Sequence, residues 1–243
     1  MATGSIAAVS RRRPDPLEVI RDELVACRAC PRLVEWRERV AREKVARFAG
    51  EDYWGRPVPG FGDPCARVLV LGLAPAAHGG NRTGRIFTGD RSGDFLYASL
   101  HRTGFASQPT SVARDDGLAL RGLYVAAVNR CAPPGNEPTP EERDRCLPFL
   151  EREIRALPEL RTIAALGEVA WDGALRALRT LGHVVKPRPP FRHGAEVPIG
   201  PYVLLGAYHP SQQNTFTGRL TAEMLDAVLE RARALAFEGT ASH

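Results

Sequence analysis

The stretch RVLVLGLAPAAHGGNRTGRIFTGD, residues 67–90, indicates the fold more directly than any other part of the chain. Its first part, RVLVLGL at residues 67–73, is a nearly continuous apolar run, which predicts a buried strand. The loop that follows is rich in Gly, Arg and Thr, and it ends in Asp90. Such a loop suits a bound anion, but it lacks the Gly-Lys-[Ser/Thr] of a P-loop and a G-x-G-x-x-G directly after the strand.

Apolar runs alternate with helical patterns along the rest of the chain. Two N-terminal helices are expected, opening at Pro16 and Pro31, with Pro at the first helical position. The expected strands and later helices are, in order, strand 67–73, a helix after Ser92, strand 123–128, helix 140–156, strand 161–166, a helix to about 181, strand 202–208 and helix 219–237. Residues 183–200 form a Pro-rich connection, with a hairpin as one option. This alternation predicts an α/β fold with a parallel sheet that is covered on both faces.

Ligands of such sheets bind beyond the carboxyl ends of the strands. That rule selects three loops, at residues 74–90, 129–138 and 209–218. The same three loops have the most unusual compositions in the chain. We therefore expect them to form one shared site.

The composition is that of an ordinary globular protein, with 243 residues, 44% hydrophobic and 25% charged. We expect one domain over residues 14–238, a disordered basic tail at 1–13 and a short tail at 239–243. The net charge of +5 comes almost wholly from arginine, because Lys44 and Lys186 are the only lysines. This balance mildly favours a polyanionic partner. No apolar run is long enough to span a membrane, and the N-terminus lacks the order of a secretory signal, so a cytoplasmic location is expected.

The five cysteines fall into two pairs and one single residue. Cys27 and Cys30 form a C-x2-C, while Cys131 and Cys146 are separated by fourteen residues. Scattered buried thiols are common in a cytosolic chain. Two pairs, however, supply four thiolate ligands, which suit either zinc or an iron–sulfur cluster. Cys65 is expected to be a plain packed thiol.

Three long blocks resemble a known family. They are GLAPAAHGGNRTGRIFTGD at residues 72–90, VNRCAPPGNEPTPEERDRC at 128–146 and HPSQQNTFTGRL at 209–220. Together with CRAC at 27–30, they resemble the family 5, or type B, branch of the uracil-DNA glycosylase superfamily. The resemblance implies a three-layer α/β/α fold around a four-stranded parallel sheet, in a single glycosylase domain with N-terminal cluster-binding helices. It implies a [4Fe–4S] cluster on the two cysteine pairs, with zinc as the alternative and no catalytic metal.

The resemblance also implies a monofunctional DNA repair enzyme that removes uracil, and hypoxanthine among other deaminated bases, leaving an abasic site. Base excision needs groups that stabilise a cationic sugar, direct water and stabilise the departing anionic base. By resemblance, His209 donates a hydrogen bond to the departing base, Asp90 faces the sugar, and Asn136 helps to place the water or the flipped nucleotide. A helix N-cap is the alternative role for Asp90.

The resemblance further assigns residues to the base pocket. Phe87 is expected to stack on the flipped base, and the backbone from Gly72 to Ala76, with Leu73 and Ala74 between them, to line the pocket. Ala127 stands where strict uracil enzymes place a base-reading Asn, so we expect relaxed discrimination, unless neighbouring Asn129 substitutes for that residue.

Contacts with double-stranded DNA are expected from the same edge of the sheet. Ser211, Gln212, Gln213, Asn214 and Arg219 lie in a loop suited to probing a groove, and Arg82, Arg85 and Arg91 suit phosphates. We expect a monomer that associates with the nucleoid. Two rival hypotheses are a catalytically inactive DNA-binding protein of the same fold and an iron–sulfur electron carrier.

Overall fold

The computed structural model describes residues 14–237, and the two predicted tails lie outside these residues. Its helices and strands follow the order α1 (Pro16–Val25), α2 (Pro31–Glu43), the short 3-10 helix η1 (Ala46–Phe48), β1 (Phe61–Gly62), β2 (Val68–Gly72), α3 (Gly80–Thr83), α4 (Arg91–Arg102), β3 (Leu123–Ala127), the 3-10 helix η2 (Pro134–Asn136), α5 (Pro140–Ala156), β4 (Thr162–Leu166), α6 (Glu168–Thr180), β5 (Glu196–Ile199), β6 (Tyr202–Ala207), α7 (Gln212–Phe216) and α8 (Ala222–Phe237). The four predicted strands are present to within one or two residues at each end.

The sheet has six strands in the order β1-β3-β2-β4-β6-β5, not the four that were predicted. The central four, β3, β2, β4 and β6, are parallel and match the prediction. The two additional strands are short, antiparallel and at the edges. Strand β5 pairs with β6 as the hairpin that was one option for the Pro-rich connection. The α/β class and the three-layer arrangement are confirmed.

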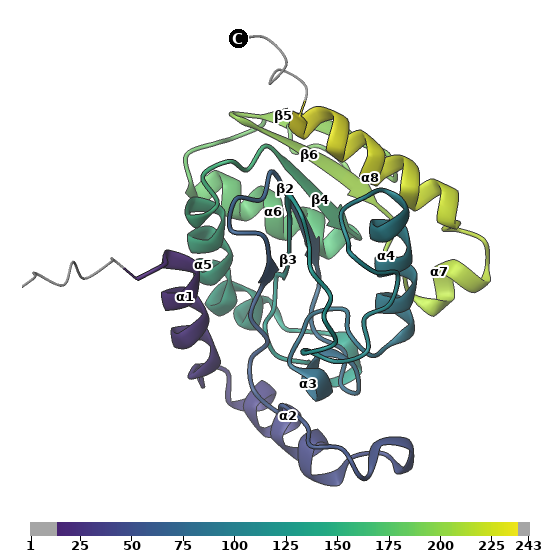
Figure 1. Ribbon diagram of the computed structural model, residues 1–243. Helices are drawn as coiled ribbons and strands as arrows, with labels where there is room; N and C mark the ends of the chain where they lie inside the picture. The colour runs from purple at the N-terminus through teal and green to yellow at the C-terminus, as the bar shows by residue number, and fades with distance from the viewer. Residues whose placement is uncertain (1–13, 238–243) are drawn as a thin grey trace, which may run out of the picture.

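Alternate side chains of the strands enter two apolar cores, one on each face of the sheet. One core packs β2 and β3 residues such as Val70 and Val125 against α4 and α8. The other packs Leu71 and Ala126 against α1, α5 and α6. Figure 1 shows α4 and α8 on one side of the sheet and α1 and α5 on the other. No described helix has the length and apolar character needed to cross a membrane.

Candidate active site

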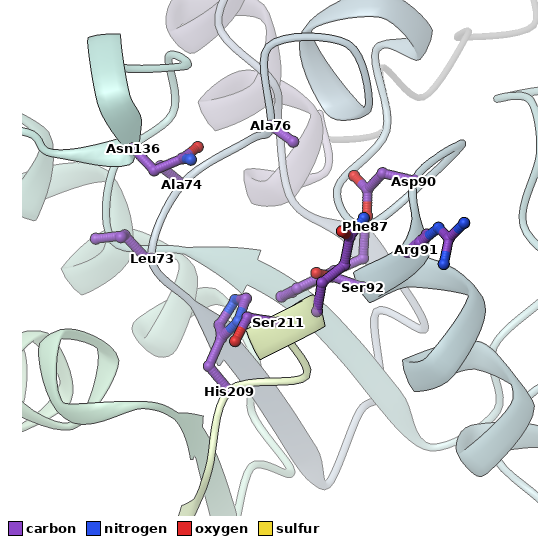
Figure 2. Close-up of a pocket in the computed structure, with 11 residues that line it drawn as sticks. Leu73, Ala74, Ala76, Phe87, Asp90, Arg91, Ser92, Asn136, His209 and Ser211 are labelled. Atoms are coloured by element: carbon purple, nitrogen blue, oxygen red, sulfur yellow. The ribbon is translucent and has the colours of Figure 1, made fainter. Parts of the chain in front are cut away.

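The loops that follow β2, β3 and β6 surround one cavity of about 400 Å³ at the carboxyl edge of the sheet (Figure 2). Because the central strands are parallel, their carboxyl ends meet at this edge, as expected. The lining residues are Leu73, Ala74, Ala76, Phe87, Asp90, Arg91, Ser92, Asn136, His209, Ser211 and Gln212. The three residues with predicted catalytic roles, one from each loop, therefore lie around the same space.

Asp90 uses its two carboxylate oxygens differently. It is the N-cap of α4, and Oδ1 accepts a hydrogen bond of 2.9 Å from the backbone N–H of Gly93. Oδ2 lies against Gly79, so close that a Cβ at that position would be 1.9 Å away. Burial raises the pKa of the carboxyl, and the N–H of Gly93 opposes this shift. The capping alternative is correct: Oδ1 caps α4, and Oδ2 packs against Gly79 at the edge of the cavity.

Phe87 covers one wall of the cavity, and its backbone adopts a left-handed conformation with φ of 52°. A bulky residue in this region is strained by about 1–3 kcal/mol, so the surrounding structure must hold it. Its ring lies over Gly72, where an added Cβ would be 2.7 Å from the ring. The ring centroid of Phe87 is 5.9 Å from that of His209.

His209 follows β6 after one intervening residue and faces the cavity (Figure 2). Its main-chain carbonyl accepts a hydrogen bond of 2.8 Å from Nδ2 of Asn214, which fixes the turn into α7. Burial lowers the pKa of the imidazole to about 4. His209 is therefore neutral at physiological pH and retains one N–H that can donate to an oxygen gaining negative charge.

Asn136 ends the 3-10 helix η2 and reaches the cavity from the loop after β3. Its φ of 60° and the φ of 62° at Gly135 place two successive residues in the left-handed region. Asn tolerates this region better than most residues do, because its short polar side chain bonds locally. The turn projects the amide towards the same space as His209.

Gly72 and Ala127 do not line the cavity, so their predicted contact with a base is corrected. Ala127 is 1% exposed and lies opposite Gly72 in the β2–β3 pair. Gly72 leaves room for the ring of Phe87 and does not itself form the wall. Asn129, the substitute considered above, is also fully buried and outside the lining residues. Leu73 and Ala74 do line the cavity.

Arg82 and Arg85 are buried, which argues against their predicted contacts with DNA phosphates. Arg82 is 8% exposed, pairs with Glu51 and donates to the carbonyl oxygen of Gly89 at 3.0 Å. Arg85 is 3% exposed and pairs with Asp116 at 2.7 Å. Both side chains are used within the protein, where they hold the loop that ends in Asp90.

The loop from 211 to 219 divides into structural and exposed residues. Ser211 caps α7 and lines the cavity, and Asn214 holds the carbonyl of His209. The exposed residues of this loop include Gln212, Gln213 and Arg219. Arg219 lies over the ring of Tyr208, with its Cζ 4.6 Å from the ring centroid. These three residues are free to meet a ligand that approaches the cavity.

Comparison with known proteins agrees with this geometry. The model of the uracil DNA glycosylase superfamily matches residues 59–233, which include all three loops. The chain belongs to the uracil-DNA glycosylase superfamily. A type-5 uracil-DNA glycosylase of Mycobacterium bovis is 57% identical over 86% of this chain and 78% of its own length. That of Thermus thermophilus is 54% identical over 90% of this chain and 98% of its own. A type-5 enzyme of Pyrobaculum aerophilum is 46% identical.

In this member of the superfamily, the four paired cysteines lie where the N-terminal helices meet β3 and α5. Cys30 directly precedes α2 and packs with Cys131, and Nη1 of Arg37 donates to Sγ of Cys131 at 2.8 Å. Burial raises the pKa of Cys131 to about 12 and that of Cys146 to about 11. Each of these thiols is close enough to others of the four to influence their pKa. As placed, no three His, Cys, Asp or Glu side chains of the described residues are arranged to hold a metal ion.

Two residues of the glycosylase-like cavity, Arg91 and Ser92, were not assigned to the base pocket from sequence. Both line it at the start of α4, and Ala76, at the end of the predicted pocket segment, lines it as well. Ser92 was placed correctly at a helix start, but a helix pattern does not indicate which end of the helix meets a cavity. Near this end, Arg91 also lies 5.5 Å from the exposed ring of Phe216.

Proposed function

We propose that this chain is a uracil-DNA glycosylase that hydrolyses the N-glycosidic bond of deoxyuridine in double-stranded DNA and leaves an abasic site. The observation that carries the proposal is the single cavity lined by Asp90, Asn136 and His209. The family match and the activity for which the type-5 relatives are named support it. The lining residues come from three loops of a single domain, and we propose that the protein acts as a monomer.

Each side chain then has a chemical task. The target base leaves the stack and enters the cavity beside the ring of Phe87. The neutral imidazole of His209 donates a hydrogen bond to a carbonyl oxygen of the base, which gains negative charge as the bond to the sugar breaks. The carboxylate of Asp90 stabilises the cationic sugar and orients water, and the amide of Asn136 helps to hold that water.

We propose that the same cavity also accepts hypoxanthine. The wall formed by Leu73, Ala74 and Ala76 is apolar and offers no side-chain donor and acceptor pair to read the edge of a base. With Asn136 assigned to the water, a wall without such a reader discriminates weakly between bases that carry the same exocyclic oxygen. The support is the chemistry of the wall, since the relatives' names mention uracil alone.

A base-excision experiment tests both parts. Labelled duplexes carry uracil opposite G, hypoxanthine opposite T, or no lesion, and chelator is present throughout. Alkali then cleaves any abasic site. Alkali-dependent cleavage at both lesions supports the full proposal, and cleavage at uracil alone removes the hypoxanthine part. Tight duplex binding without cleavage favours the inactive DNA-binding protein.

The pH dependence of excision follows from the two shifted groups. Asp90 must be ionised, and its raised pKa moves the acid limb of kcat above the 3.8 of an ordinary aspartate. His209 stays neutral above about pH 5, so no second limb is expected near 6.5. Activity should therefore rise with pH along one acid limb and remain level through neutrality. A pH–rate profile checks this, with Asp90→Asn expected to abolish the limb. An acid limb centred near 6.5 that persists in Asp90→Asn contradicts the assignment.

We propose that Cys27, Cys30, Cys131 and Cys146 hold a [4Fe–4S] cluster that stabilises the fold. The support is chemical: all four side chains are thiols, the ligand type of such clusters, they influence one another's pKa, and Arg37 beside Cys131 complements an anionic cluster. When bound, the cluster would cross-link α2, the loop after β3 and α5. It has no step in the excision chemistry proposed above.

Cysteine variants give the corresponding prediction. Cys131→Ala, prepared anaerobically, is expected to lose most of its iron and its visible absorbance and to melt about 5 °C or more below wild type. Cys65→Ser is the matched control, because Cys65 is exposed, not packed as the sequence suggested, and lies outside the two cysteine pairs. Its iron content should equal that of wild type. If the wild-type protein contains zinc in place of iron, the proposal of a cluster is wrong and the alternative metal is supported.

A further inference from the structure

Phe87 has an unfavourable backbone conformation. Its φ of 52° is in the left-handed region, although Phe has a bulky side chain. The ring nevertheless lies in a defined place, over Gly72 and beside His209. A loop that carries such a residue keeps its shape only when neighbouring groups fix it.

The residue after Phe87 is fixed by a buried guanidinium. Nε of Arg85 donates to Oγ1 of Thr88 at 2.9 Å, and Nη2 donates to Oγ of Ser111 at 2.8 Å and to Oδ2 of Asp116 at 2.7 Å. Nη1 donates to the carbonyl of Arg114 at 3.2 Å. All three nitrogens of the Arg85 guanidinium therefore donate hydrogen bonds, and all their acceptors lie within residues 85–88 or 111–116.

The other neighbours of Phe87 are fixed as well. The hydroxyl of Tyr97 donates to the carbonyl of Ile86 at 3.1 Å, and the N–H of Gly89 donates to the carbonyl of Ser111 at 2.8 Å. The hydroxyls of Thr88 and Ser111 are 2.7 Å apart. The segment is thus held on both sides of the strained residue.

Asp116 organises the far end of this network. In addition to Arg85, its carboxylate accepts hydrogen bonds from the backbone N–H groups of Val112, Ala113 and Leu118. Although burial opposes it, the guanidinium and these N–H groups lower the pKa of Asp116 to about 2. The carboxylate therefore stays ionised and couples the loop 111–118 to the segment that carries Phe87.

We propose that Arg85 and Asp116 form a positioning pair that holds the ring of Phe87 in place to stack on the base in the cavity. The inference rests on the proposed function for its substrate and deepens it, because it assigns a role in base binding to a buried ion pair outside the cavity. Neither residue touches the base. A ring displaced by about 1 Å is enough to misalign a stacked base for reaction.

A double-mutant cycle tests the pair. Phe87→Ala is expected to lower kcat about 10- to 100-fold, the range of base–aromatic stacking. Arg85→Met should lower kcat about tenfold and leave KM nearly unchanged, and Asp116→Asn should act in the same direction. In the Phe87→Ala background, Arg85→Met should have no further effect on kcat, because the ring that it positions is already absent.

The matched control is Arg102→Met, which breaks the pair with Asp226 between α4 and α8, away from residues 85–89. It should lower the melting temperature without lowering kcat at a temperature where the variant is folded. An Arg85→Met enzyme with wild-type kcat overturns the proposal. So does a double variant whose loss equals the product of the two single losses, because independent effects multiply.

A crystal structure of Arg85→Met supplies a readout that needs no activity. Departure of Phe87 from its left-handed backbone and from Gly72 supports the positioning role, and an unchanged ring overturns it. If wild type fails to excise uracil, the proposed function fails, while this structural outcome still decides whether Arg85 places the ring. The two failures are therefore distinguishable.

Discussion

Replacing His209 with alanine is expected to lower kcat for uracil excision by about 10²- to 10³-fold, with little change in duplex affinity. The imidazole lines the cavity and is kept neutral by a pKa of about 4. In the proposed reaction it therefore meets the departing base as a hydrogen-bond donor without a positive charge. A donor aimed at an oxygen that gains charge acts more strongly in the transition state than in the bound substrate, so the loss should appear in kcat.

Single-turnover excision from a uracil duplex measures this effect, and fluorescence anisotropy on an undamaged duplex measures binding. His101→Ala is the control, because His101 is an exposed residue in the last turn of α4. It should excise at the wild-type rate. Asn214→Ala gives a graded test, since it removes only the bond to the carbonyl of His209 and should cause a smaller loss. Full activity in His209→Ala would remove His209 from the chemistry.

The central fold was predictable because its four strands are short apolar runs separated by helical patterns. The edge strands were less so: β1 has only two residues, and β5, allowed for only as one option in the Pro-rich connection, contains Pro198 and two exposed positions. Neither carries a periodic apolar signal. Strand β1 is placed by its pairing with β3, which is distant in sequence. Strand β5 is placed by its pairing with β6, to which a turn joins it. Pairing of this kind is a tertiary property.

The shared cavity was predictable because loops after the carboxyl ends of parallel strands converge, and these loops carry His209, Asp90 and Asn136. The role of a residue was not predictable where its partners decide it. Arg85 in a glycine-rich loop suggests a phosphate ligand until Asp116, 31 positions away, is seen to pair with it. Gly72 suggests a pocket wall until the ring of Phe87 is seen above it.

Replacing Asp90 with asparagine is expected to lower kcat by about 10²- to 10⁴-fold while changing stability little. The amide oxygen can still accept the hydrogen bond of the Gly93 N–H, because Asn is as good an N-cap as Asp. The negative charge is lost, however, and with it the stabilisation of the cationic sugar and the acceptor that orients water. Asp90→Ala removes both roles and should also cost about 0.5–2 kcal/mol of stability.

The single-turnover rate constant for excision and the melting temperature, measured on both variants, separate the two roles of Asp90. If the carboxylate acts in the reaction, Asp90→Asn and Asp90→Ala lose kcat to a similar extent, and only the alanine variant melts lower. If Asp90 is solely a cap, Asp90→Asn retains kcat. Asp15→Asn is the matched control, because Asp15 caps α1 through the N–H of Leu17, in a different part of the fold. Its substitution should change neither quantity, so a loss confined to position 90 reflects the cavity and not helix capping.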